Sequence, residues 1–73
     1  MTTAEAVQQT QHRFPDFTDI MTVDGVAIHV WELHDGSVLE IRVNRRTTGV
    51  ISRRLYDETT DVALCYRHLT KTH

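Results

Sequence analysis

Hydrophobic and polar residues alternate with a period of two through the middle of the chain. The alternation runs from about residue 20 to residue 56, and turn-forming residues interrupt it at Asp24–Gly25, Asp35–Gly36 and Thr47–Gly49. Aspartate followed by glycine is typical of tight β-hairpin turns, and Thr-Thr-Gly favours a short loop. The pattern therefore predicts four strands in an antiparallel meander, at residues 20–23, 26–33, 38–46 and 50–56.

The lengths of these turns predict which side chains share a face of the sheet. A two-residue type I′ turn at Asp35–Gly36 places Val30 opposite Ile41. A three-residue loop with Gly49 in the left-handed conformation places Arg42 opposite Arg54. Both hairpins then agree on one buried face: Val26, Ile28, Val30, Leu39, Ile41, Val43, Ile51 and Leu55. A slip of one residue would instead bring Glu32, Glu40 and Arg42 inside, so the pattern discriminates between registers.

The two ends of the chain carry helical patterns of unequal strength. Near the C-terminus, four residues fall on one face of a helix: Val62, Cys65, Tyr66 and Leu69. Near the N-terminus, Thr2 and Glu5 suit a capping box, but that segment offers few apolar residues to bury. We therefore expect a flexible or weakly helical, acidic segment at residues 1–19 and a small domain at residues 20–73.

The expected fold class follows from these elements. It is α+β, with an antiparallel β-meander of three to four strands packed on a C-terminal helix and a marginal or frayed N-terminal helix. A chain of 73 residues supports one small core and leaves little room for a deep pocket. The lone cysteine, Cys65, has no partner in the chain, and no apolar run approaches the roughly 20 residues of a membrane span. We expect a cytoplasmic, non-enzymatic monomer or homodimer that contacts no membrane and holds no cofactor.

Charge is distributed unevenly along the sequence. Residues 1–41 hold one basic residue against seven acids, whereas residues 42–73 hold seven basic residues against three acids. The net charge of −2 offers no general attraction to nucleic acid. The stretch "VNRRTTGVISRR" nevertheless places four arginines in one hairpin. The sequence is therefore dipolar, and the fold decides whether the molecule is dipolar too.

The face opposite the predicted core is rich in aromatic and basic residues. Tryptophan, tyrosine and arginine dominate the hot spots of protein interfaces. Arginines directly opposite each other repel unless an anion or carboxylate lies between them. We therefore interpret six residues as candidates for partner binding: His29, Trp31, Arg42, Arg46, Arg54 and Tyr56. In the alternative interpretation, Phe14, Phe17 and the acids near them fold back over this face and neutralise it internally.

Metal binding and nucleophilic catalysis are weaker interpretations. Cys65 and His68 have the i, i+3 spacing of two metal ligands, but the chain has no second pair with zinc-site spacing. Cys65 also belongs to the apolar helical stripe, which predicts a buried, unreactive thiol. We therefore predict neither a metal site nor catalytic residues.

One stretch resembles part of a known DNA-binding fold. "TGVISRRLYDETTDVALCYRH" is similar to the last hairpin and helix of the three-stranded-sheet domains found at the amino end of tyrosine integrases and in plant ethylene-response factors. The resemblance implies that four residues read the DNA major groove: Trp31, Arg42, Arg46 and Arg54. Glu32 and Glu40 depart from that pattern, because they lie near the implied reading face.

Two classes of function stay open at this point. The first is a small regulator that binds a larger protein stoichiometrically, such as a phage- or bacterial-type inhibitor or adaptor of transcription or defence machinery. The second is a DNA- or RNA-binding module that uses the arginines of the sheet and of the hairpin at residues 43–54. The acidic balance, the single lysine and the acidic start of the last helix favour protein binding.

Overall fold

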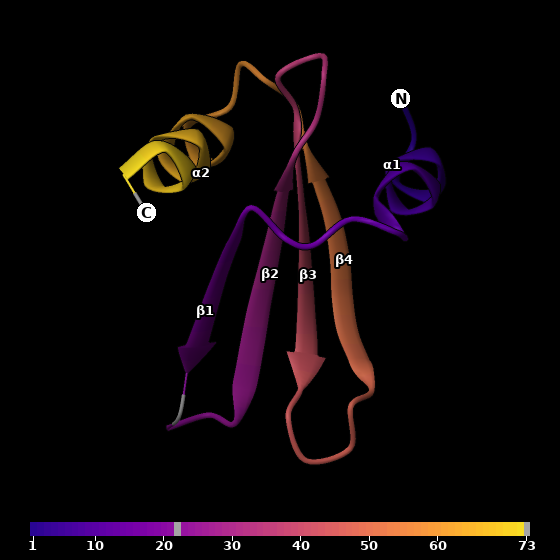
Figure 1. The fold of residues 1–73 in the computed structure, drawn as a ribbon, viewed down its shortest axis with the longest axis vertical. Coiled ribbons are helices and arrows are strands. Elements are labelled where there is room, and N and C mark those ends of the chain that lie inside the picture. Colours follow the sequence, from indigo (N-terminus) through magenta and orange to yellow (C-terminus); the bar gives the residue numbers. More distant parts are fainter. Residues whose placement is uncertain (22, 73) are drawn as a thin grey trace.

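The chain folds into four strands and two helices (Figure 1). The computed structural model describes residues 1–21 and 23–72. In chain order the elements are α1 (Thr3–Thr10), β1 (Phe17–Met21), β2 (Val26–Glu32), β3 (Val38–Asn44), β4 (Val50–Tyr56) and α2 (Asp61–Thr72). The strands form one antiparallel sheet in the order β1-β2-β3-β4. The predicted α+β fold, with its meander and C-terminal helix, is confirmed.

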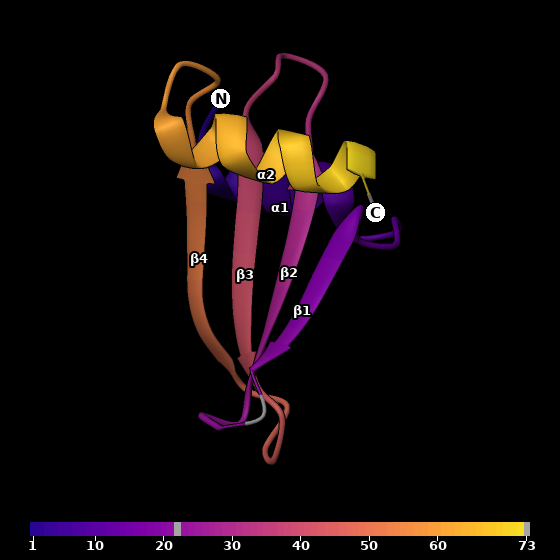
Figure 2. The ribbon, with the colours of Figure 1, turned by 90° about the vertical axis from the view of Figure 1, so that its left-hand side faces the viewer.

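The two helices lie on opposite faces of the sheet, as Figures 1 and 2 show together. Helix α1 packs on β3 and β4 from one side, and α2 crosses β1, β2 and β3 on the other. Both helices lie near the β2–β3 turn, and neither reaches the loops at the far end of the sheet (Figure 2). We call the half of the sheet between the helices, which includes Val30, Trp31, Val38 and Leu39, the covered end. The half nearer the β1–β2 and β3–β4 loops, which includes Ile20, Ala27, Val43 and Val50, is the open end.

The β2–β3 turn is one residue longer than the sequence pattern predicts. The Leu33 amide donates to the Ser37 carbonyl at 2.9 Å, and the Gly36 amide donates to the Leu33 carbonyl at 3.0 Å. The loop therefore has three residues and ends on Gly36 with a left-handed φ of 87°, as in a type I turn followed by a bulge. Val30 lies opposite Glu40, so the predicted pairing of Val30 with Ile41 was wrong.

This one-residue difference divides the apolar side chains between the two faces of the sheet, because successive residues of a strand point to opposite sides. On the α1 side, one buried cluster holds Ala6, Trp31, Leu33 and Leu39. On the α2 side, a second cluster holds Ile28, Val30, Val38 and Ala63. The predicted single buried face was therefore wrong, and each helix covers a core of its own.

Helix α1, expected to be marginal, is a regular element in this arrangement. Its predicted capping box is present, because the Glu5 amide donates to the Thr2 hydroxyl and the Thr2 amide donates to the Glu5 carboxylate. Hydrogen bonding to the Glu5 carboxylate from the Thr2 backbone, and then from the Thr2 side chain, lowers the pKa of Glu5. Ala6 is fully buried against the sheet. The helix is stabilised by the second apolar face, which the predicted register did not provide.

The β3–β4 hairpin also differs in detail from the prediction. Val43 pairs with Val50 after a register shift, and the left-handed residue of the loop is Thr48, with φ 59°, rather than Gly49. Arg42 lies opposite Ser52. The expected apposition of Arg42 with Arg54 was therefore wrong.

The buried face of α2 and the start of the sheet are displaced as well. Ala63 is fully buried, whereas Val62 is 40% exposed and Cys65 is exposed. The predicted stripe was therefore wrong for Val62 and for Cys65. Strand β1 begins at Phe17, earlier than predicted, so the expected boundary between residues 19 and 20 falls inside a strand. Of the strand predicted at residues 20–23, residue 22 lies outside the described residues.

Candidate functional site

The six residues predicted to bind a partner do not form one surface. His29 and Trp31 lie on the α1 face, whereas the side of the sheet that faces α2 holds Arg42, Arg54 and Tyr56. Arg46 lies in the β3–β4 loop. The longer β2–β3 turn is the cause, because it reverses the faces of β3 and β4 relative to β2.

Trp31 is a core residue held by the N-terminal segment. It is 9% exposed, it packs with Ala6 and Leu39, and its indole Nε1 donates to the Arg13 carbonyl at 3.0 Å. The N-terminal segment therefore covers Trp31, but through Ala6 and Arg13. The cover by Phe14 and Phe17 that the alternative assumed was wrong, because Phe14 is exposed and Phe17 packs on the α2-side cluster. The neutralisation that the alternative also assumed is not seen for Asp16, whose carboxylate pairs with Arg13 at 3.3 Å rather than with an arginine of the sheet.

The arginines of the α2 face surround a buried carboxylate. Glu40 is 1% exposed, accepts a hydrogen bond from Arg42 Nε at 3.0 Å, and lies opposite Arg54. The Tyr66 hydroxyl of α2 donates to the second oxygen of Glu40. Burial, and then the hydrogen bond to Glu40, raise the pKa of Tyr66, and the same carboxylate raises the pKa of Arg42. Neighbouring arginines need a carboxylate or anion between them, and here Glu40 of the protein itself fills that role for Arg42. Through Tyr66, Glu40 also joins α2 to the sheet.

The open end carries an apolar row on the α1 face that crosses all four strands. Ile20 pairs with Ala27, Ala27 with Val43, and Val43 with Val50. Ile20 is 50% exposed and Val50 is 44% exposed. The adjoining row on this face holds Thr18, His29, Ile41 and Arg53. Ala27 is buried, Val43 is half-buried, and Ile41 packs against the α1-side cluster, so the apolar row meets solvent chiefly at its two ends.

Arg45 and Arg46 lie beside this row on the β3–β4 loop, and Arg53 lies on β4. The Asn44 side-chain oxygen accepts from the Arg46 amide at 2.9 Å, and the Arg45 amide donates to the Gly25 carbonyl at 2.9 Å. Within residues 1–21 and 23–72, no ion pair involves Arg45, Arg46 or Arg53. We call the apolar row and these three arginines the open-end surface: Ile20, Ala27, Val43, Arg45, Arg46, Val50 and Arg53.

Acidic residues gather at the opposite end of the molecule. The β2–β3 turn and the segment leading into α2 carry Asp35, Asp57, Glu58 and Asp61. Hydrogen bonds from Ser37 lower the pKa of Asp35, and hydrogen bonds from Thr59 lower the pKa of Asp57. Three of these four acids belong to the basic half of the sequence, and Asp24 lies in the β1–β2 turn at the open end, so the asymmetry along the sequence is not carried over directly into space.

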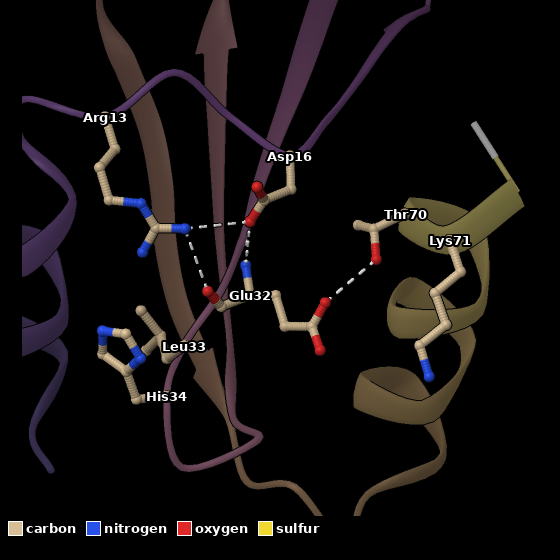
Figure 3. A pocket seen from close by; sticks show the side chains of 7 residues that line it. All are labelled: Arg13, Asp16, Glu32, Leu33, His34, Thr70 and Lys71. Atoms are coloured by element: carbon tan, nitrogen blue, oxygen red, sulfur yellow. Dashed lines mark hydrogen bonds and ion pairs between the residues drawn. The ribbon is translucent and has the colours of Figure 1, made fainter.

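A polar cleft of about 590 Å³ lies between the α1–β1 segment, the end of β2 and the end of α2 (Figure 3). Its lining residues are Arg13, Asp16, Glu32, Leu33, His34, Thr70 and Lys71. Its carboxylates already have partners: Asp16 accepts from the Glu32 amide at 2.7 Å, and Glu32 accepts from the Thr70 hydroxyl at 3.3 Å. Both carboxylates of the cleft are therefore engaged within the fold.

The chemical alternatives gain no geometric support. In the described part of the chain, no three His, Cys, Asp or Glu side chains are grouped to hold a metal ion. The expectation of a buried thiol was wrong, because Cys65 is exposed. Across residues 1–21 and 23–72, the helices are too short or too polar to span a bilayer.

No protein-family model, curated protein or solved structure matches this chain. The partial resemblance to DNA-binding domains requires Trp31 and Arg42 on one reading face. They project from opposite faces of the sheet, and Trp31 is buried. That set of residues therefore does not form a shared groove-reading surface.

Sequence reasoning missed most of the open-end surface. The predicted buried face includes Val43, and the six predicted binding residues include neither Arg45 nor Arg53. The available signal was the second loop geometry that His34–Gly36 allows, since a left-handed glycine suits both turn types. A three-residue loop places Trp31, Leu39 and Val43 on one face, but it does not specify how much of that face a helix covers.

Proposed function

We propose that this protein is a small, non-enzymatic regulator that acts by binding a larger protein stoichiometrically through the open-end surface. The observation that carries this proposal is the apolar row from Ile20 to Val50, which crosses the whole sheet, is about half exposed at both ends, and lies beside three arginines without ion pairs in the described residues. An exposed apolar strip with charged residues at its edge is typical of protein-binding sites. A phage- or bacterial-type inhibitor or adaptor that acts on transcription or defence machinery fits the small size of the chain and its single candidate binding surface.

The chemistry of the surface defines the partner. Val43, Val50 and Ile20 require an apolar patch, and the arginines require carboxylates around it. The acids of the covered end would repel an acidic partner from that side. The partner is therefore an acidic protein surface with an apolar centre, approached by the open end first.

Quantitative capture tests this proposal. The immobilised chain is exposed to nuclease-treated lysate of the source cells, and the variants Val50→Asp and Arg45→Glu are compared with the wild type. We expect Val50→Asp to abolish capture and Arg45→Glu to weaken it by about tenfold, because each places a carboxylate against the partner. The matched charge reversal Lys71→Glu, at the far side of the molecule, should leave capture unchanged. Equal capture by all three variants would contradict the proposal.

Nucleic-acid binding is the second candidate, favoured by one observation. Arg45, Arg46, Arg53 and Arg54 are all exposed and have no ion pair in the parts of the chain that the structure describes. Phosphate contacts by these arginines would give an affinity that falls log-linearly with salt concentration. Capture that disappears after nuclease treatment, with that salt dependence, would favour this function over the first.

A further inference from the structure

Strand β4 is an open edge of the sheet. It is the last strand in the order β1-β2-β3-β4, so within residues 1–21 and 23–72 no strand lies beyond it. Figure 2 shows β4 as the outermost strand, with most of its length below the level of both helices. An uncovered edge strand presents backbone amides and carbonyls that can pair with another extended chain. The edge of β4 is therefore a surface to which a strand can be added.

The register identifies the backbone groups of β4 that point outward. The Asn44 amide donates at 2.8 Å to the carbonyl that precedes β4. Backbone direction alternates along a strand, so Glu40 also turns its amide and carbonyl toward β4, where it lies opposite Arg54. The backbone groups of Arg54 therefore point to β3, and those of its neighbours Arg53 and Leu55 point away from the sheet.

A bulge limits the part of β4 that is open to regular pairing. The register shifts by one residue between Ser52 and Val50, which leaves Ile51 without a partner in β3. Bulges are one of the devices that keep a sheet edge from pairing. Pairing is therefore available along residues 52–56, which we call the regular part of β4.

Charge restricts what this edge accepts. Arg53 and Arg54 are exposed, and neither is in an ion pair in the described part of the chain. Residue 54 is the middle of the regular part, so a second copy aligned over that part would set Arg54 opposite its own counterpart. Like charges directly opposite each other destabilise a strand pair, whereas opposite charges stabilise it. The edge therefore disfavours a second copy and favours an acidic strand.

The other edge of the sheet differs in length and in charge. Strand β1 has five residues, whereas β4 has seven, and the exposed charge of β1 is the acidic Asp19. Beyond Tyr56, the chain continues with two further exposed acids, Asp57 and Glu58. An acidic segment would be repelled at both places. The regular part of β4 is therefore the stretch of edge that suits such a segment.

We propose that the partner adds an extended acidic segment to the β4 edge, with two consecutive carboxylates beside Arg53 and Arg54. Successive residues of a strand point to opposite faces, so two neighbouring acids meet two neighbouring arginines. This inference rests on the proposed protein binding and names the element by which the partner engages. Val50 and Arg53 belong to the open-end surface, so the added strand extends that surface by one strand.

A blocked peptide, Thr-Val-Glu-Glu-Thr-Val, tests the edge without the natural partner. In an NMR titration of the isotope-labelled chain, we expect shift changes along β4. Near saturation, the amide exchange of Arg53 and Leu55 should slow by about tenfold or more, because each amide gains a hydrogen bond. The Arg54 amide, which is directed to β3, should change little. The matched peptide with two lysines in place of the glutamates should leave β4 unchanged, and shift changes confined to β1 or the helices would overturn the proposal.

Backbone methylation separates strand addition from charge attraction. N-methylation of the Arg53 amide, introduced by chemical synthesis, removes an outward donor and keeps the side chain. The modified chain should keep its thermal midpoint and lose about tenfold or more in affinity for the acidic peptide. The matched modification is at Thr18, whose amide points outward from β1 because its neighbour Phe17 pairs with Val30. That chain should bind as the unmodified one does, and equal affinity of the two methylated chains would overturn the proposal.

The two proposals fail separately. If Val50→Asp abolishes capture from lysate while the acidic peptide leaves the Arg53 and Leu55 amides unprotected, strand addition fails and the proposed function stands. If the peptide protects these amides but the wild-type chain captures no protein, the proposed function fails and β4 is left as a peptide-binding edge.

Discussion

The two ends of the sheet differ in what they bury, although the same strands run through both. At the covered end, Val30, Val38 and Leu39 are fully buried between two helices. At the open end, Ile20 and Val50 remain about half exposed, and the neighbouring arginines have no ion pair in the described residues. Because burial supplies most of the stability of a small domain, the covered end holds the fold together. The residues of the open end contribute less to stability, so their identity can serve binding instead.

The largest effect on stability is expected where the covered end buries a charge. Arg42→Met removes the cation beside Glu40, which is 1% exposed, and leaves the Tyr66 hydroxyl as its remaining side-chain partner. Breaking a buried pair from one side costs several kcal/mol, and we expect about 3 kcal/mol here because the Arg42 side chain is partly exposed. Urea unfolding measures the loss, and the matched Arg53→Met should change the free energy of unfolding by less than about 0.5 kcal/mol.

A double substitution sharpens this first test. Glu40→Gln together with Arg42→Met removes the charge that would otherwise be stranded, so most of the stability should return. A double variant as unstable as Arg42→Met alone would show that Arg42 acts through its packing and not through Glu40.

The second-largest effect on stability is expected from the same substitution, valine to alanine, made at each end of the sheet. Val30→Ala opens a cavity beneath α2 and should cost about 2 kcal/mol, or a fall of roughly 10 °C in the thermal midpoint of a domain this size. Val50→Ala removes the same atoms from a half-exposed site and should cost less than about 1 kcal/mol. Calorimetry of both variants checks the difference, and equal losses would mean that the open end contributes to the core as much as the covered end does.

The smallest effect is a dependence on alkaline pH. The pKa of Tyr66 is raised, so the folded state favours the protonated phenol that donates to Glu40. The stabilisation is complete below the ordinary tyrosine pKa of about 10 and is lost as pH rises beyond it. Thermal midpoints measured from pH 8 to 11 should fall less for Tyr66→Phe than for the wild type. Tyr56→Phe serves as the control, and an unchanged slope in Tyr66→Phe would refute the assignment.

The element pattern was predictable from sequence, but the faces of the sheet were not. Alternation, Asp-Gly turns and the C-terminal amphipathic pattern are local signals, and they specify strands and helix directly. The choice between a two-residue and a three-residue loop before Ser37 is not local, because both satisfy the same glycine. The observed register buries Glu40 beside Arg42 of the same strand and Tyr66 of α2, and the contact with Tyr66 joins residues 26 positions apart.

The same difference accounts for the packing of the N-terminal helix and for the scattered binding residues. The N-terminal segment has few apolar residues, so intrinsic propensity alone makes it a weak helix. Its stability comes from Trp31 and Leu39, which the predicted register did not place on one face. Binding residues selected for that register were consequently dispersed, whereas Arg46 stayed accessible because a loop position does not depend on strand pairing.

The length of the turn at His34–Gly36 has a structural consequence beyond that hairpin. With three residues in the loop, the sheet has apolar side chains on both faces, and each terminal helix packs on one of them. A loop shorter by one residue would place the aliphatic side chains on one face of the sheet, and one helix would then have no apolar surface to pack on. The space around Gly36 also excludes a larger residue, since a Cβ there would lie 2.8 Å from the Glu58 carboxylate. A small surface turn thus determines whether this protein is a sandwich of three layers or of two.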